Sequence, residues 1–167
     1  MKDRASFGIE LQDRTIAELF GLYRAILREL RAGGIIRTDN APTGDYAEYL
    51  TLAVYGGELA PPSEKSWDVR SGDGRRLQVK ARVLNGGAGE HQLGVLRSFD
   101  FDALVAVQFD AEYGIARALE VPPSTARALA RPRPHENGAA LFIDRRLLHD
   151  PSVVDVSDRF RSVISAA

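Results

Sequence analysis

The longest regular pattern of hydrophobic and polar positions runs over residues 15–32, TIAELFGLYRAILRELRA. Apolar residues recur there at spacings of three and four, which predicts an α-helix with one apolar stripe. Thr15 and Glu18 have the spacing of a capping box at a helix start, and Gly33 and Gly34 predict the helix end. The stripe consists of Ile16, Leu19, Phe20, Tyr23, Ile26, Leu27 and Leu30, and the arginines lie largely off it.

A second helix is predicted over residues 45–55, DYAEYLTLAVY, and the pair Gly56-Gly57 should stop it. The consecutive prolines of ELAPPSEKS then predict a loop, because proline cannot continue either regular structure. The side chains expected to face inward on this helix are Tyr46, Leu50, Ala53 and Val54.

Residues 67–82, WDVRSGDGRRLQVKAR, have the pattern of a β-hairpin with its turn at Gly72-Asp73-Gly74. The simplest register pairs Ser71 with Arg75. Val69 then faces Leu77 on an apolar side, because alternate residues of a strand share a face. In the same register the opposite side carries Asp68 across from Gln78, with Lys80 one pleat further along.

The remaining pattern predicts a mobile glycine-rich loop over 85–94, a strand buried on both faces over 101–109, a turn at 110–114 and a strand over 115–121. It continues with a short helix over 122–130, a loop over 131–138, a strand over 139–143 and a closing helix over 157–165 with Ser157 as its cap. The first three strands are expected to form a meander without a crossover helix. The fold class is therefore α/β, with a central mixed sheet of about five strands flanked by helices.

Length and composition indicate one domain over residues 1–167, with residues 1–12 poorly ordered. There is no cysteine, no apolar run of the roughly 20 residues that span a bilayer, and no signal-like N-terminus. The expected location is cytoplasmic, without membrane contact. A net charge of −1 argues against nucleic-acid binding over the whole surface but leaves room for a local basic groove.

The choice of cation at position 80 points to chemistry. The chain has 22 lysines and arginines, of which only Lys2, Lys65 and Lys80 are lysine. Asp68 and Gln78 offer hard oxygen ligands suited to Mg²⁺ or Mn²⁺. A compact ammonium beside such a metal can stabilise a developing phosphate charge or orient an attacking water, and unlike arginine it can deprotonate.

An acid on one strand, followed by a short motif with lysine on the next, resembles the PD-(D/E)XK, or restriction-endonuclease-like, nuclease superfamily. The matches are Asp68 for the first acid, Gln78 for the second and Lys80 for the lysine, with Glu48 in GDYAEYL at the place of the glutamate on the preceding helix. The resemblance implies a restriction-endonuclease-like core over about residues 43–145 and catalytic roles for these four residues. The expected metal ligands are Asp68, Gln78, the carbonyl of Val79, and Glu48. Glutamine in the second acidic position removes one negative charge from the site.

Each of these residues also has a plainer interpretation. Asp68 and Lys80 can be solvent-facing strand residues whose ion pairs contribute little, and Glu48 can form a capping pair with Asp45 at a helix start. His91 has no second histidine nearby, so zinc is not expected.

Five arginines surround the hairpin in the sequence. Arg82 continues the face of Lys80 and is favoured for contact with a phosphate backbone. The charges can equally be a solvated edge that discourages strand association. The residues proposed for nucleic-acid binding are Arg82, Arg76, Arg97 and Arg70, with Arg75 in the same cluster.

The function expected first is a Mg²⁺-dependent (or Mn²⁺-dependent) DNA endonuclease without a small-molecule cofactor. The second is a catalytically silent member of the fold that binds nucleic acid or a protein, which Gln78 favours. A third, in which residues 35–58 form a helix-turn-helix reader, is weakened by the proline before the second helix. Cleavage of both strands requires two active sites, so a homodimer is expected on functional grounds.

Overall fold

The computed structural model describes residues 9–38, 40–85 and 91–166. The chain forms two compact units, residues 1–42 and residues 43–167. Most of the segment 1–12, for which poor order is predicted, lies outside the described residues.

The first unit is dominated by helix α1, Ile16–Ala32, as the pattern predicts. The capping box is confirmed: the Glu18 amide donates to Thr15 Oγ1 at 3.3 Å, and the Thr15 amide donates to Glu18 Oε2 at 2.8 Å. Gly33 caps the other end, and Gly34 follows with a φ of 72°. These contacts satisfy amides and carbonyls that a bare helix end leaves without partners.

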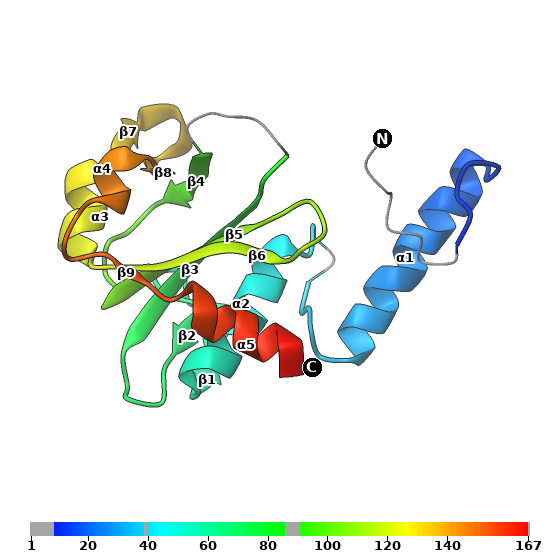
Figure 1. Cartoon of the computed structure of the whole chain (residues 1–167), viewed down its shortest axis with the longest axis horizontal. Coiled ribbons are helices and arrows are strands. Elements are labelled where there is room, and N and C mark those ends of the chain that lie inside the picture. The colour runs from blue at the N-terminus through cyan, green and yellow to red at the C-terminus, as the bar shows by residue number, and fades with distance from the viewer. Residues whose placement is uncertain (1–8, 39, 86–90, 167) are drawn as a thin grey trace. The chain divides into compact units, whose positions relative to one another are not determined.

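The second unit is a mixed α/β domain with two sheets, as Figure 1 shows. The larger sheet has six strands in the order β1-β2-β3-β5-β6-β9, and the smaller has three in the order β4-β8-β7. The strands are β1 Glu58–Leu59, β2 Val69–Arg70, β3 Arg76–Val83, β4 His91–Leu96, β5 Ala103–Phe109, β6 Ile115–Val121, β7 Arg131–Arg133, β8 Gly138–Ile143 and β9 Val154–Asp155. The helices are α2 Thr43–Tyr55, α3 Pro123–Leu129, α4 Arg145–Leu148, α5 Ser157–Ala166 and the short 3-10 helix η1 Pro134–Glu136.

Strand β5 lies at the centre of the larger sheet and is buried along its whole length, which confirms the prediction for residues 101–109. Its side chains alternate between two hydrophobic clusters. Val105 and Val107 belong to the cluster that includes Leu50 of α2 and Phe160 of α5. Leu104 and Ala106 belong to the cluster that contains residues of β4, β8, α3 and α4. The larger sheet is thus covered on one face by helices and on the other by the smaller sheet and its helices.

The predicted meander is wrong at one pairing. β2 and β3 are antiparallel, but β3 and β5 are parallel. After β3 the chain must therefore return to the end of the sheet at which β3 began before it can form β5. The return segment carries β4, which joins the smaller sheet. Residues 91–94 are therefore strand instead of loop, while residues 86–90 of the predicted mobile loop lie outside the described residues. The glycines in this segment led to the prediction of a loop, although its Leu93 and Leu96 are buried in a hydrophobic cluster of the domain.

Other differences are local. The predicted loop over 131–138 contains β7 and η1, and the short elements β1, α4 and β9 were not predicted because they span only two to four residues. Ser157 is the first residue of α5 and not its cap, since its amide and hydroxyl donate to Asp155 Oδ1. Ala53 is exposed, although the other inward positions predicted on α2 pack against the core.

Gly57 is the position where a side chain is least compatible with the fold. Its φ is 95°, and an added Cβ would lie 1.9 Å from the carbonyl oxygen of Arg70. We expect Gly57→Ala to lower the free energy of unfolding by roughly 3 kcal/mol or more, because left-handed strain and overpacking add. Gly44→Ala is the matched control on α2, since an added Cβ there meets no described atom within 4 Å. Denaturant melts that rank the two variants equally would contradict this expectation.

Candidate metal and phosphate site

The hairpin has the predicted register. Val69 pairs with Leu77, and the Ser71 amide donates to the Arg75 carbonyl at 2.9 Å. Gly74 supplies the left-handed residue of the turn, with a φ of 89°. The sequence pattern therefore sets which side chains share each face of the hairpin.

Asp68 and Gln78 meet across the two strands. The Gln78 side-chain amide Nε2 donates to Asp68 Oδ2, and the backbone amide of Val79 donates to the same oxygen at 2.7 Å. The second bond exists because β2 is only two residues long, so the Asp68 side chain replaces a strand partner for Val79. The carbonyl and amide of one strand residue point to the same side, which places the Val79 carbonyl on the edge of β3 that Asp68 borders.

Lys80 follows Gln78 on the same face of β3. Gln78 pairs with Leu104 and Lys80 with Ala106, and both partners belong to the cluster on the β4 side of the sheet. Gln78 is buried at 7 % exposure, while Lys80 is partly buried. An added Cβ at Gly94 of β4 would lie 3.4 Å from Lys80 Cδ, so the stem of this lysine runs across that glycine. Because Gly94 has no side chain, the Lys80 side chain has room to extend across β4 at this position.

Glu48 lies on a different element. Its helix α2 packs through Ala47 and Leu50 against Val79 and other residues of the opposite face of the sheet. Glu48 is partly buried there, and it is not without an interaction partner. The alternative capping pair with Asp45 is wrong, because α2 begins at Thr43 and both acids lie inside the helix.

The four arginines proposed for nucleic-acid contact differ in their surroundings. Arg82 is exposed and donates from Nη1 to the Gln92 carbonyl at 2.7 Å. Arg76 is held by Asp100 at 3.1 Å and Asp102 at 3.4 Å. The hydrogen bonds to Asp102 and Asp100 raise the pKa of Arg76. Arg97 is exposed, and the Arg70 guanidinium lies 5.1 Å from the centre of the Trp67 ring. Arg82 and Arg97 are thus better placed than Arg76 to meet a phosphate, because acids already neutralise Arg76.

Sequence reasoning missed Gln108. It is 1 % exposed on β5 and pairs with Arg82, which puts it on the face of Gln78 and Lys80. Its side-chain Nε2 has no hydrogen-bond acceptor in the part of the chain that the structure describes. A buried donor without an acceptor costs about 1–3 kcal/mol. The signal in the sequence was a single polar residue inside the buried run FDALVAVQF.

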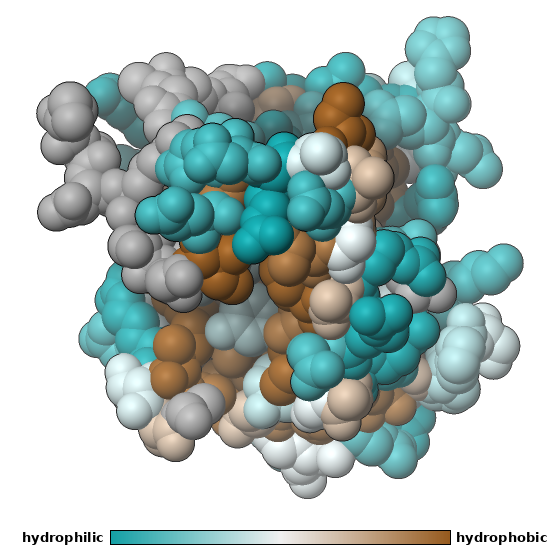
Figure 2. All heavy atoms as spheres, turned by 90° about the vertical axis from the view of Figure 1, so that its right-hand side faces the viewer, coloured by the Kyte–Doolittle hydropathy of each residue, from teal (hydrophilic) through white to brown (hydrophobic). Residues whose placement is uncertain are grey.

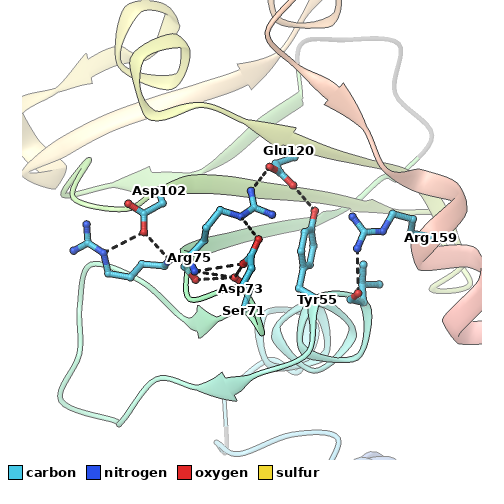
Figure 3. Close-up of polar contacts among 9 residues, drawn as sticks. Tyr55, Ser71, Asp73, Arg75, Asp102, Glu120 and Arg159 are labelled. Carbon is cyan, nitrogen blue, oxygen red and sulfur yellow. Dashed lines mark hydrogen bonds and ion pairs between the residues drawn. The ribbon is translucent and has the colours of Figure 1, made fainter.

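A second polar network fixes the hairpin in place, as Figure 3 shows. Glu120 of β6 accepts from Tyr55 Oη at 2.8 Å and from Arg75 Nη1 at 2.5 Å. Arg75 also donates to Asp73 at 3.0 Å. Burial, followed by the hydrogen bond to Glu120, raises the pKa of Tyr55. Both carboxylate oxygens of Glu120 are engaged within the network, which therefore has a structural role: it ties the start of β3 to β6 and α2.

The oxygen atoms around Asp68 are of the type that a hard cation prefers, but they carry only one negative charge. Among the described residues there is no group of three or more His, Cys, Asp or Glu side chains placed to hold a metal. What the site offers is one carboxylate, one amide oxygen and one peptide carbonyl, all oxygen ligands of the kind that Mg²⁺ accepts together with water. In the arrangement described, Gln78 presents its nitrogen to Asp68, so its oxygen becomes a ligand there only after the amide rotates by half a turn.

Comparison with family models and with curated proteins finds no match. No protein-family model matches the chain, and no curated protein is significantly similar to it. No helix in the described part of the chain is long and apolar enough to cross a membrane.

Proposed function

We propose that this chain is a divalent-metal-dependent endonuclease of the PD-(D/E)XK type, which hydrolyses phosphodiester bonds in DNA. The contact of Asp68 with Gln78 and the Val79 amide at the edge of β3 carries the proposal. β2 begins only at Val69, so the edge of β3 at Val79 faces the Asp68 carboxylate, and the Val79 carbonyl lies on this same edge. The six-stranded mixed sheet would then be a restriction-endonuclease-like core.

In this proposal, Asp68, the Gln78 side-chain oxygen and the Val79 carbonyl hold Mg²⁺ or Mn²⁺. A bound ion of this kind stabilises charge on a phosphate and lowers the pKa of water. Glu48 is carried by α2 on the face of the sheet opposite Lys80, so in this proposal it would reach the ion or its water shell past the edge of β3. Gln78 would release its hydrogen bond to Asp68 when it turns its oxygen toward the ion.

Lys80 and Arg82 would bind the phosphate. They are two residues apart on one face of β3, hence about 6.6 Å apart along the strand. Lys80 lies next to Gln78 and would neutralise the charge that develops on the scissile phosphate or orient the attacking water. Arg82, one pleat further, would contact a neighbouring phosphate and set the direction of the backbone.

A catalytically silent nucleic-acid-binding or protein-binding module is the alternative, and one observation favours it. The neutral amide of Gln78 already donates to Asp68, so this pair is satisfied without a metal. Such a module would retain Arg82 and Arg97 as surface cations and would need no ion.

Conversion of supercoiled plasmid to nicked or linear form separates the two functions. We expect conversion with Mg²⁺ or Mn²⁺, none with chelator, and none for Asp68→Asn, which keeps the shape of the side chain but loses its charge. Glu112→Gln, at an exposed position in the turn before β6, is the matched control and should cleave like the parent. DNA bound without metal-dependent cleavage would favour the silent module, and cleavage by Asp68→Asn would remove Asp68 from the site.

A further inference from the structure

Helix α1 exposes its apolar stripe. Five large hydrophobic side chains on this helix are more than one third exposed. They are Ile16 at 76 %, Leu19 at 39 %, Phe20 at 66 %, Tyr23 at 45 % and Ile26 at 55 %. Figure 2 shows hydrophobic side chains exposed among hydrophilic ones on the face of the molecule that it draws. A contiguous apolar surface of this kind marks an interaction site.

The spacing of the stripe is that of a helix packed against another helix. Ile16, Leu19, Tyr23 and Ile26 are separated by three, four and three residues, which are the a and d positions of a heptad pattern, and Phe20 is the flanking e position. Knobs at these positions insert into holes on a facing helix. α1 has 17 residues and is therefore about 25 Å long, enough for two full heptads.

The charges indicate which helix this is and how it runs. Residues 9–20 contain Glu10, Asp13 and Glu18 against the single cation Arg14, whereas residues 21–38 contain Arg24, Arg28, Arg31 and Arg37 against the single acid Glu29. Two copies of this segment in parallel would place like charges together. In antiparallel orientation each acidic half meets a basic half, and the helix dipoles oppose each other.

We propose that the exposed stripe of α1 is the contact surface of a homodimer, in which two α1 helices pair in antiparallel orientation. Centring the pair near Gly21 places Ile16 opposite Ile26 of the second copy and Leu19 opposite Tyr23 of the second copy. Phe20 then lies beside its own counterpart, close to the two-fold axis. This register buries all five exposed side chains and leaves the already buried Leu27 outside the contact.

The surface is independent of the proposed nuclease activity. It involves only residues of the first unit, so loss of the dimer and loss of a metal site are separate results. If both hold, the dimer supplies the two active sites that cleavage of both DNA strands requires.

Sedimentation of the full chain over about 5 to 200 µM tests the proposal, since a two-heptad contact should dissociate in this range. We expect a concentration-dependent monomer–dimer equilibrium in the parent and a dissociation constant at least tenfold higher for Phe20→Glu. Gly21→Glu is the matched control: it adds the same charge one residue away, off the stripe, where a Cβ meets no described atom within 4 Å. It should dimerise like the parent.

Cysteine crosslinking tests the orientation, because the chain has no cysteine of its own. Phe20→Cys should form a disulfide-linked dimer on mild oxidation, and Ile16→Cys should not, because antiparallel pairing separates the two copies of residue 16 beyond disulfide reach. Equal crosslinking of both variants would indicate a parallel pair and overturn the proposal. A parent that is monomeric throughout the range would overturn it as well. In that case a lower melting temperature for Phe20→Glu would show that the second unit of the same chain covers the stripe.

Discussion

Replacing Lys80 with alanine should abolish metal-dependent cleavage of plasmid DNA while leaving the fold intact. Lys80 is partly buried on the face of β3 that carries Gln78, and its stem passes over Gly94, which has no side chain in its way. Removal of the ammonium takes away the only lysine next to the proposed metal ligands. Loss of one charge placed against a developing phosphate charge lowers the rate by about 10²–10³-fold or more.

Two further variants sharpen this experiment. Lys65→Ala is the matched control, since Lys65 is an exposed lysine in the loop before the hairpin, and it should cleave like the parent. Lys80→Arg keeps the charge but adds a bulky planar group beside Gly94 and cannot release a proton, so it should restore little activity. Full activity in Lys80→Ala, or a lost thermal transition in that variant, would show that Lys80 does not have the proposed role.

Replacing Gln78 with glutamate should make the stability of the protein depend on metal. The Gln78 amide nitrogen donates directly to Asp68, so the new carboxylate would place an acceptor against an acceptor. In chelator at neutral pH we expect Gln78→Glu to lower the free energy of unfolding by about 1–3 kcal/mol, because two like charges in contact repel and a buried hydrogen bond is lost. Added Mg²⁺ or Mn²⁺ should restore stability, since the ion binds two carboxylates more tightly than one.

The pH dependence of this variant has a definite sign. Repulsion should raise the pKa of one carboxyl of the pair in the folded protein above its value in the unfolded chain. The unfolded chain then binds fewer protons than the folded one as pH rises through the unfolded pKa of about 4. The loss of stability should therefore be small in acid and grow toward neutral pH in the absence of metal.

Melting curves with chelator and with Mg²⁺ measure both effects. Gln78→Met is the control, because it removes the amide hydrogen bond in a similar volume without adding charge, and metal should not stabilise it. Equal responses to Mg²⁺ in the parent and Gln78→Glu would mean that position 78 does not face a metal. The proposed endonuclease would then lose its second ligand, and the silent module would be favoured.

Local structure was accessible from the sequence wherever one short-range signal dominated. The Thr15–Glu18 capping box, the glycines that end α1 and α2, and the Gly74 turn each depend on neighbours within four residues. The hairpin register followed from alternation, since a slip of one residue would turn Val69 and Leu77 away from the core. That register alone places Asp68, Gln78 and Lys80 on one face.

Tertiary structure decided what depends on distant contacts. Sequence could not show that β3 and β5 run parallel, because alternation along a strand is the same for either direction, or that the glycine-rich return segment becomes β4. It did not foresee that Glu48 and Lys80 are carried on opposite faces of the sheet, or that Gln108 is buried beside Arg82. These facts arise from the packing of elements far apart in the chain, and such packing leaves no periodic trace in the residues that it brings together.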